Sequence, residues 1–153
     1  MYNFEGAYAR FGPNCIRRAR LTFAQEKRAL AARRSQTNMG KLTTHVLNLA
    51  TGAPAARMRV RLHDLEPSPP RLLAETFTDD QGRCAQMADG GLRVGRYSLT
   101  FHIAEYFRAG GFPITEPPFL DEVVINFGVA DAAQNYHIPL LTTPWSYSTY
   151  RGS

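Results

Sequence analysis

Cysteine is nearly absent from this sequence. The 153 residues contain two cysteines, Cys15 and Cys84. They are far apart and form no CxxC pair, so the sequence predicts neither a disulfide framework nor a cysteine-based zinc site. Cysteine usage of this kind is typical of a reducing compartment.

Long apolar runs are also missing. No stretch approaches the roughly 20 apolar residues that a membrane-spanning helix needs. The N-terminus lacks the apolar core of a secretory signal peptide, and the C-terminus carries no peroxisomal tripeptide. We therefore expect a cytoplasmic protein with no membrane partner. The length, with 44% hydrophobic and 20% charged residues, is typical of one globular domain.

Excess positive charge is confined to the first quarter of the chain. Residues 1–38 hold eight Lys or Arg and two Glu, a net charge of +6, whereas residues 39–153 hold ten Lys or Arg and eleven Asp or Glu, a net charge of −1. A near-neutral body is a poor polyanion-binding surface, so no nucleic-acid partner is expected. We interpret residues 1–38 as a dispensable N-terminal extension, helical at 21–34 or disordered, with Met39 as the functional start. The alternative is a basic arm that contacts nucleic acid or an acidic partner.

The body of the chain has the pattern of β-strands. Residues 96–103 show it most clearly, because Tyr97, Leu99, Phe101 and Ile103 alternate with polar residues. Turn residues separate further strand-like runs at 42–48, 58–64, 72–78, 119–129, 136–141 and 145–150. A short strand is expected from Arg83, after the turn at 79–82, and a brief helix at 104–109. The pattern predicts an all-β antiparallel sandwich with one short helix.

The C-terminal run is unusually aromatic. Trp145, Tyr147 and Tyr150 precede the final Arg151-Gly152-Ser153. Most chains fray at their ends, but aromatic side chains bury large areas, so we expect this end to be docked on the domain.

Four histidines are the candidates for chemistry. His63 and His102 lie on the polar faces of their expected strands and are predicted to be surface residues. The pattern alone leaves a structural and a functional role equally open for His45 and His137. No catalytic triad is recognisable by spacing, because such groups are assembled in space.

Two segments together resemble the transthyretin-like family. The run His45-Val46-Leu47-Asn48 followed by Thr51-Gly52-Ala53-Pro54 resembles the N-terminal signature of the family, and residues 136–141 with 144–153 resemble its C-terminal signature. The terminal Tyr-Arg-Gly-Ser is similar to the mark of the enzyme branch, which hydrolyses 5-hydroxyisourate. Segments 78–83 and 118–121 are also similar to the family, so the resemblance covers residues 39–153.

The resemblance implies a transthyretin-like (prealbumin-like) sandwich of two four-stranded antiparallel sheets. It also implies a homotetramer with active sites where dimers meet, and hydrolysis of 5-hydroxyisourate to 2-oxo-4-hydroxy-4-carboxy-5-ureidoimidazoline in urate breakdown. The family uses no metal or cofactor. Two alternatives are a carrier of small hydrophobic ligands, as in the hormone-carrying branch, and a sandwich that only binds a partner.

The resemblance also assigns site residues. His45 and His137 match the catalytic histidines, and substrate binding is assigned to His45, Arg83, Tyr150, Arg151 and Ser153. A histidine, whose ordinary pKa is about 6.5, can deprotonate water at neutral pH. The planar guanidinium of Arg83 suits a carbonyl-rich, acidic ring. Which histidine acts as the base is left open.

Overall fold

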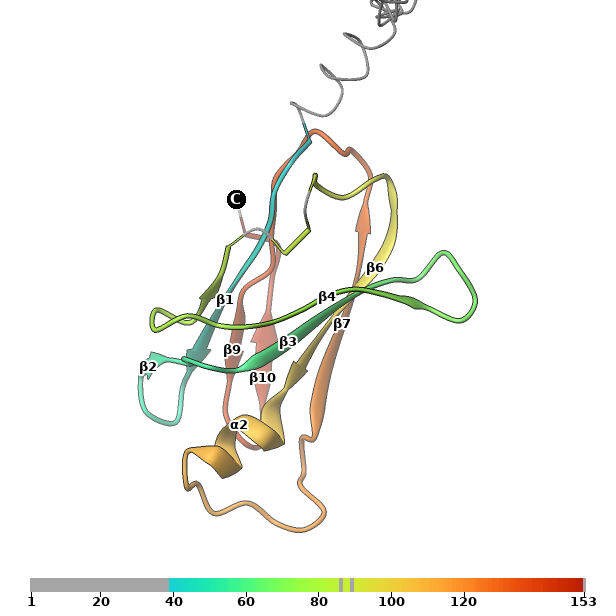
Figure 1. Cartoon of the computed structure of the whole chain (residues 1–153). Helices are drawn as coiled ribbons and strands as arrows, with labels where there is room; N and C mark the ends of the chain where they lie inside the picture. Colours follow the sequence, from blue (N-terminus) through green and yellow to red (C-terminus); the bar gives the residue numbers. More distant parts are fainter. Residues whose placement is uncertain (1–38, 86, 89, 153) are drawn as a thin grey trace, which may run out of the picture.

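Two β-sheets pack face to face in the computed structural model of the chain (Figure 1). The structure describes residues 39–152, except residues 86 and 89. The expectations for the extension at 1–38 and for Ser153 therefore lie outside the described residues. Across the part that is described, no helix is long and apolar enough to cross a membrane.

The first sheet has four antiparallel strands, as predicted. Its order is β4-β3-β6-β7. The strands are β3 (Arg59–Asp64), β4 (Arg71–Phe77), β6 (Gly95–His102) and β7 (Glu122–Val129). Leu62 of β3 lies directly opposite Leu99 of β6, and both are fully buried. The alternation seen in the sequence thus correctly identifies the face of β6 that turns to the core.

The second sheet is built around β1 (Leu42–Asn48), whose bounds match the prediction. Its path is β10-β9-β1-β2, and β5 and β8 also pair with β1. The partners are β2 (Ala53–Pro54), β5 (Arg83–Cys84), β8 (Tyr136–His137), β9 (Leu140–Thr142) and β10 (Tyr147–Thr149). Two details differ from the prediction: the sheet has six strands instead of four, and β1 pairs with β8 and β9 in parallel.

Proline explains why the predicted strand at 136–141 is divided. Pro139 has no N–H to donate to a ladder, so it separates β8 from β9. The parallel pairing follows from the path of the chain, because between β1 and β8 it passes through all four strands of the other sheet and then re-enters this sheet in the direction of β1.

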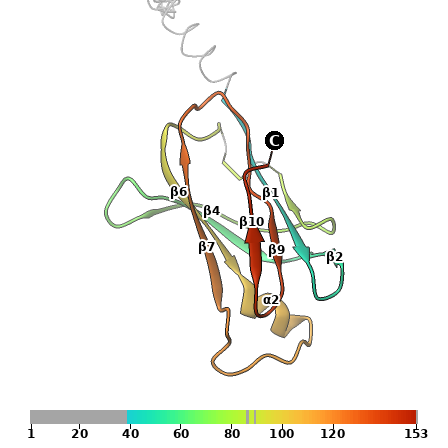
Figure 2. The same ribbon diagram turned by 180° about the vertical axis from the view of Figure 1, so that it is seen from behind.

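Apolar side chains from both sheets form one core. Val46, Leu99, Phe101 and Leu140 are fully buried within it. Burying each such side chain stabilises the fold by about 1.5–3 kcal/mol. The helix α2 (Ile103–Ala109) follows β6 directly and covers one end of the sandwich (Figure 2).

His102 is buried, so the prediction that it is a surface residue is wrong. It lies on the outward face of β6 but is only 5% exposed. Its Nδ1 atom lies 2.9 Å from Oε1 of Glu122 on β7 and 3.4 Å from Nη2 of Arg59 on β3. The alternation identified the face correctly, but long side chains from both neighbouring strands cover the ring.

Candidate active site

The outward face of β1 brings the predicted site residues together. Burial alternates along the strand, so Thr44 and Val46 enter the core while Thr43 and His45 point away from it. His45 lies opposite Arg83 of β5, and Thr43 lies opposite His137 of β8. Three residues that are distant in the sequence thus meet on one face of one sheet.

A tight turn holds Arg83 in place. The Oδ1 atom of Asp79 accepts hydrogen bonds from the backbone N–H of Arg83 at 2.8 Å and of Gln81 at 2.9 Å. Gly82 has a φ of +70°, and a Cβ there would lie 2.4 Å from the carbonyl oxygen of Val46. Glycine is therefore required for the turn to press against β1. Within the described residues, the exposed Arg83 side chain makes no ion pair.

The ring of His137 is oriented by a neighbouring hydroxyl. Thr43 Oγ1 lies 2.9 Å from His137 Nδ1. The hydroxyl can donate to or accept from Nδ1, depending on the tautomer. In either case Nε2 has no hydrogen-bond partner among the described residues, so it remains available for a ligand.

The backbone near the C-terminus is docked against His137, as predicted, but the aromatic side chains expected to bury themselves there stay largely exposed: Trp145 58%, Tyr147 50% and Tyr150 59%. Gly152 forms a β-bridge with His137, and its N–H donates to the His137 carbonyl at 2.8 Å. A Cβ at Gly152 would lie 2.5 Å from Cδ2 of the His137 ring. Because only glycine allows so close an approach, the backbone at Gly152 packs directly against this histidine.

The side chains of the terminal tetrapeptide are not gathered around His137. The Arg151 guanidinium lies over the Tyr136 ring, 5.1 Å from its centroid, and Nη2 donates to Gln134 at 2.9 Å. Tyr136 lies on the opposite face of β8 from His137. Tyr150 is 59% exposed. Substrate binding by Tyr150 and Arg151 stays a prediction, and Ser153 lies outside the described residues.

The surroundings of His45 favour its neutral form. Burial is the largest cause that lowers the pKa of His45 below its ordinary value, and the positive charge of Arg83 is the next. His137 lowers it further, whereas a hydrogen bond to the Gln81 backbone and the charge of Asp79 act in the opposite direction. A neutral imidazole at neutral pH can accept a proton from water.

A cavity of about 390 Å³ opens beside these residues and is lined in part by Lys41, Arg83 and His137. This volume falls within the roughly 300–1,000 Å³ of small-molecule sites. His45 does not line the cavity itself but adjoins it through its partner Arg83. Cys84 also lines it, but burial raises the pKa of the thiol to about 11. A protonated thiol is a poor nucleophile, so histidine is the better candidate for the chemistry.

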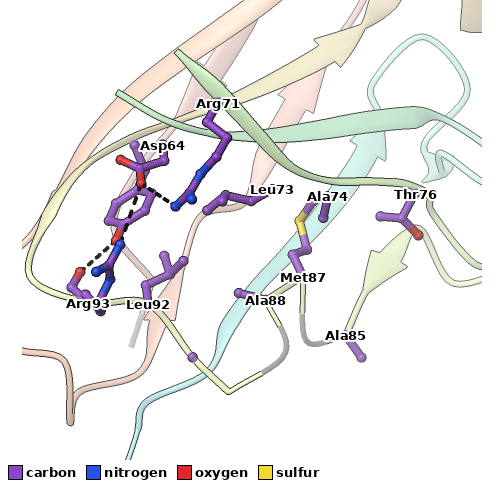
Figure 3. Close-up of a pocket in the computed structure, with 12 residues that line it drawn as sticks. Asp64, Arg71, Leu73, Ala74, Thr76, Ala85, Met87, Ala88, Leu92 and Arg93 are labelled. Carbon is purple, nitrogen blue, oxygen red and sulfur yellow. Dashed lines mark hydrogen bonds and ion pairs between the residues drawn. The ribbon is translucent and has the colours of Figure 1, made fainter. Parts of the chain in front are cut away.

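A second cavity, of about 400 Å³, lies between β4 and the segment that leads into β6 (Figure 3). Its buried Asp64 carboxylate pairs with Arg71 at 3.1 Å and with Arg93 at 4.0 Å. None of the predicted site residues lines it. Its single carboxylate already pairs with both of its arginines, so we assign it no part in the chemistry.

Thr43 is a residue that the sequence reasoning missed. Its signal was present, since it precedes His45 by two positions and therefore shares its face of the strand. Its contact with His137 was not visible, because parallel pairing is set by the fold. No group of three or more His, Cys, Asp or Glu side chains within the described residues is arranged to hold a metal ion.

Comparisons with known proteins identify the family of the chain. The model of the HIUase/Transthyretin family matches residues 42–152. The 5-hydroxyisourate hydrolase of Pseudomonas aeruginosa is 48% identical over 117 residues, which cover 75% of this chain and 93% of that protein.

Solved structures show the same fold. The 5-hydroxyisourate hydrolase of Klebsiella pneumoniae superposes with a TM-score of 0.65 at 33% identity, covering 75% of this chain and all of that one. Sea bream transthyretin in complex with thyroxine has a TM-score of 0.66 at 21% identity, covering 73% of this chain and 94% of that one. The second likeness concerns the fold alone.

Proposed function

The chain belongs to the HIUase/transthyretin family, and we propose that it hydrolyses 5-hydroxyisourate at the site formed by His45, Arg83 and His137. One observation carries the assignment. Two histidines and an exposed arginine lie together on the outward face of the second sheet, His45 and Arg83 as direct neighbours and His137 beside Thr43. A carrier of hydrophobic ligands has no use for such a set of polar groups.

The reaction opens a lactam ring by adding water. His45 takes a proton from the water, and the water oxygen adds to the ring carbonyl carbon. The carbon–nitrogen bond then breaks. The carbon becomes the carboxylate of the product, and the nitrogen receives a proton and becomes part of the ureido group.

Arg83 and His137 act on the substrate and the water. The guanidinium of Arg83 binds the ring oxygens and offsets the negative charge that develops on the carbonyl oxygen. His137, fixed by the Thr43 hydroxyl, holds the water through Nε2 and shares the proton transfers. Burial and the nearby positive charge of Arg83 favour the neutral form of His45, whose pKa they lower below its ordinary value.

The site is completed by assembly into a homotetramer, in which active sites lie in the channel between dimers. Support comes from exposed aromatic residues on and next to the edge strand β10. Trp145 is 58% exposed and Tyr147 is 50% exposed. Burying them between copies of the chain removes a large apolar surface from water. In this arrangement Tyr150 and Ser153 border the pocket, and Arg151 fixes the tail through Tyr136.

The proposed function is tested by following the ultraviolet absorbance of freshly made 5-hydroxyisourate with and without the protein. We expect the protein to accelerate the decay well beyond the spontaneous rate. Decay at the spontaneous rate would reject hydrolysis and favour the carrier. Light scattering after size exclusion tests the assembly separately, with four chains per particle expected.

A further inference from the structure

We infer that Lys41 forms a carboxylate-binding subsite, which holds the acidic group that appears when the ring opens. The inference rests on the proposed reaction and extends it to a residue that neither the sequence motifs nor the histidine set includes. Lys41 lines the same cavity of about 390 Å³ as Arg83 and His137.

The backbone of Lys41 is fixed from both sides. Its N–H donates to Oδ1 of Asn135 at 2.9 Å, and its carbonyl accepts from the N–H of Tyr136 at 2.8 Å. The residue next to Tyr136 is His137, which pairs with Thr43. These contacts tie Lys41 to the strand that carries the catalytic histidine, so its flexible side chain projects from an anchored position.

Lys41 continues a line of functional side chains along β1. Residues at positions 41, 43 and 45 alternate with the buried Leu42 and Thr44, so Lys41, Thr43 and His45 share one direction. Thr43 lies between Lys41 and His45 on this face. The cation is thus placed at the His137 end of the site, while Arg83 is the neighbour of His45.

The charge around the cavity is positive. Among the described residues, its charged lining side chains are Lys41 and Arg83, beside the titratable His137 and Cys84, and none of them is a carboxylate. Lys41 makes no ion pair with any residue of the described range. An ammonium group left unpaired beside a small-molecule cavity is suited to bind a ligand anion.

The chemistry supplies such an anion. Hydrolysis of the lactam converts a carbonyl carbon into a carboxylate, so negative charge builds up on the side of the ring that opens. A cation that meets this charge as it forms stabilises the transition state as well as the product. Arg83 offsets the charge on the carbonyl oxygen, and Lys41, at the His137 end of the site, binds the second carboxylate oxygen, which the water supplies.

The first test compares kinetics of the full chain with Lys41→Gln, Lys41→Arg and Arg96→Gln. Arg96 is the control because it is an exposed cation on the other sheet and its replacement changes the net charge equally.

We expect Lys41→Gln to lower kcat/KM by about 5- to 20-fold, the effect of a solvent-exposed charged hydrogen bond. Inhibition by accumulating product in full progress curves should weaken in parallel, and Lys41→Arg should restore both. An unchanged unfolding midpoint separates this role from a structural one. If Lys41→Gln and Arg96→Gln show the same kcat/KM and the same inhibition by product, the inference is overturned.

The second test does not depend on catalysis. Lys27 and Lys41 are the two lysines of the sequence. Reductive methylation of the Lys27→Arg chain with ¹³C-formaldehyde therefore gives one lysine dimethylamino signal. Because 5-hydroxyisourate also opens spontaneously, the product forms whether or not the protein is active. We expect the Lys41 signal to shift as the product accumulates.

The two proposals fail in different ways. If the wild-type chain does not accelerate the decay but the Lys41 signal shifts, the hydrolase assignment fails and the carboxylate subsite stands. If the wild-type chain is active while the Lys41 signal stays unmoved, the subsite is rejected and the hydrolase assignment stands.

Discussion

His45 and Arg83 are direct partners on two adjacent antiparallel strands, β1 and β5. The strand pairing places a fixed positive charge beside an imidazole, so it lowers the pKa of His45 in addition to the effect of burial. In the proposed mechanism, the same contact positions the arginine for the substrate and favours the neutral histidine, which can accept a proton.

Replacing His45 with Ala should lower kcat by about 100-fold or more, because general-base catalysis contributes roughly 10²–10⁴-fold. Hydrolysis followed by ultraviolet absorbance provides the measurement. His63→Ala is the matched control, since His63 is half-buried on the other sheet and lies outside the site. Full activity of His45→Ala with the native particle size would remove His45 from the mechanism.

The activity should depend on pH through the neutral form of His45. A protonated imidazole cannot accept a proton, so kcat/KM rises with pH through the pKa of His45. Because that pKa is lowered, the midpoint should lie below about 6.5. In the Arg83→Gln chain the pKa of His45, followed by NMR titration, should move up because a neighbouring positive charge is lost. A pKa that does not move would show that Arg83 has no influence on His45.

Thr43→Val should disturb catalysis with little effect on the fold. Valine keeps the shape but loses the hydrogen bond to Nδ1 of His137. The loss of about 1–2 kcal/mol of orientation energy corresponds to a fall in kcat of roughly 5- to 30-fold. Thr43→Ser keeps the hydroxyl and should recover most of kcat. Equal activity of the valine and serine variants would show that the contact does not position the ring.

Cys84 should be dispensable for catalysis even though it lines the cavity. Its thiol pKa of about 11 leaves almost no thiolate at neutral pH. In the Cys15→Ser chain, Cys84 should react with iodoacetamide far more slowly in the native than in the unfolded state. Cys84→Ala should retain kcat within about threefold and lose roughly 1 kcal/mol of stability for the small cavity it leaves. A large loss of kcat in Cys84→Ala, with stability unchanged, would show that the Cys84 thiol takes part in catalysis.

A chain that starts at Met39 should fold and act like the full chain. Gly40 donates to the Ala132 carbonyl at 2.7 Å, and a Cβ at Gly40 would lie 1.7 Å from the Gln134 carbonyl oxygen. The domain is thus tightly packed from its second described residue onward. We expect kcat/KM and the unfolding midpoint to match those of the full chain. A clear fall in kcat/KM or in the unfolding midpoint would show that residues 1–38 contribute to activity or to stability.

The sequence pattern predicted those strands well whose structure follows from the alternation of their own residues. The bounds of β1 agree with the prediction, and β6 and β7 have the expected alternation. Tyr136 to Leu141 was predicted as one strand because its apolar pattern is continuous, but Pro139 interrupts the ladder. Because proline cannot donate to a strand ladder, the division of this strand could have been predicted from the sequence.

Pairing between distant strands was beyond the local pattern. Nothing near His137 indicates that it will lie opposite Thr43 in a parallel ladder, and nothing near His102 indicates that Arg59 and Glu122 will cover it. The histidines and arginine of the site were found through motif resemblance, whereas the contacts of Thr43 and Gly152 with His137 required the fold.

The bond between Gly152 and His137 has a practical consequence for handling the protein. Any affinity tag or fusion partner added at the C-terminus would follow closely on Gly152, whose backbone lies against the ring of His137. Such an addition would crowd the proposed active site. Purification tags and fluorescent labels are therefore best attached at the N-terminal end of the chain.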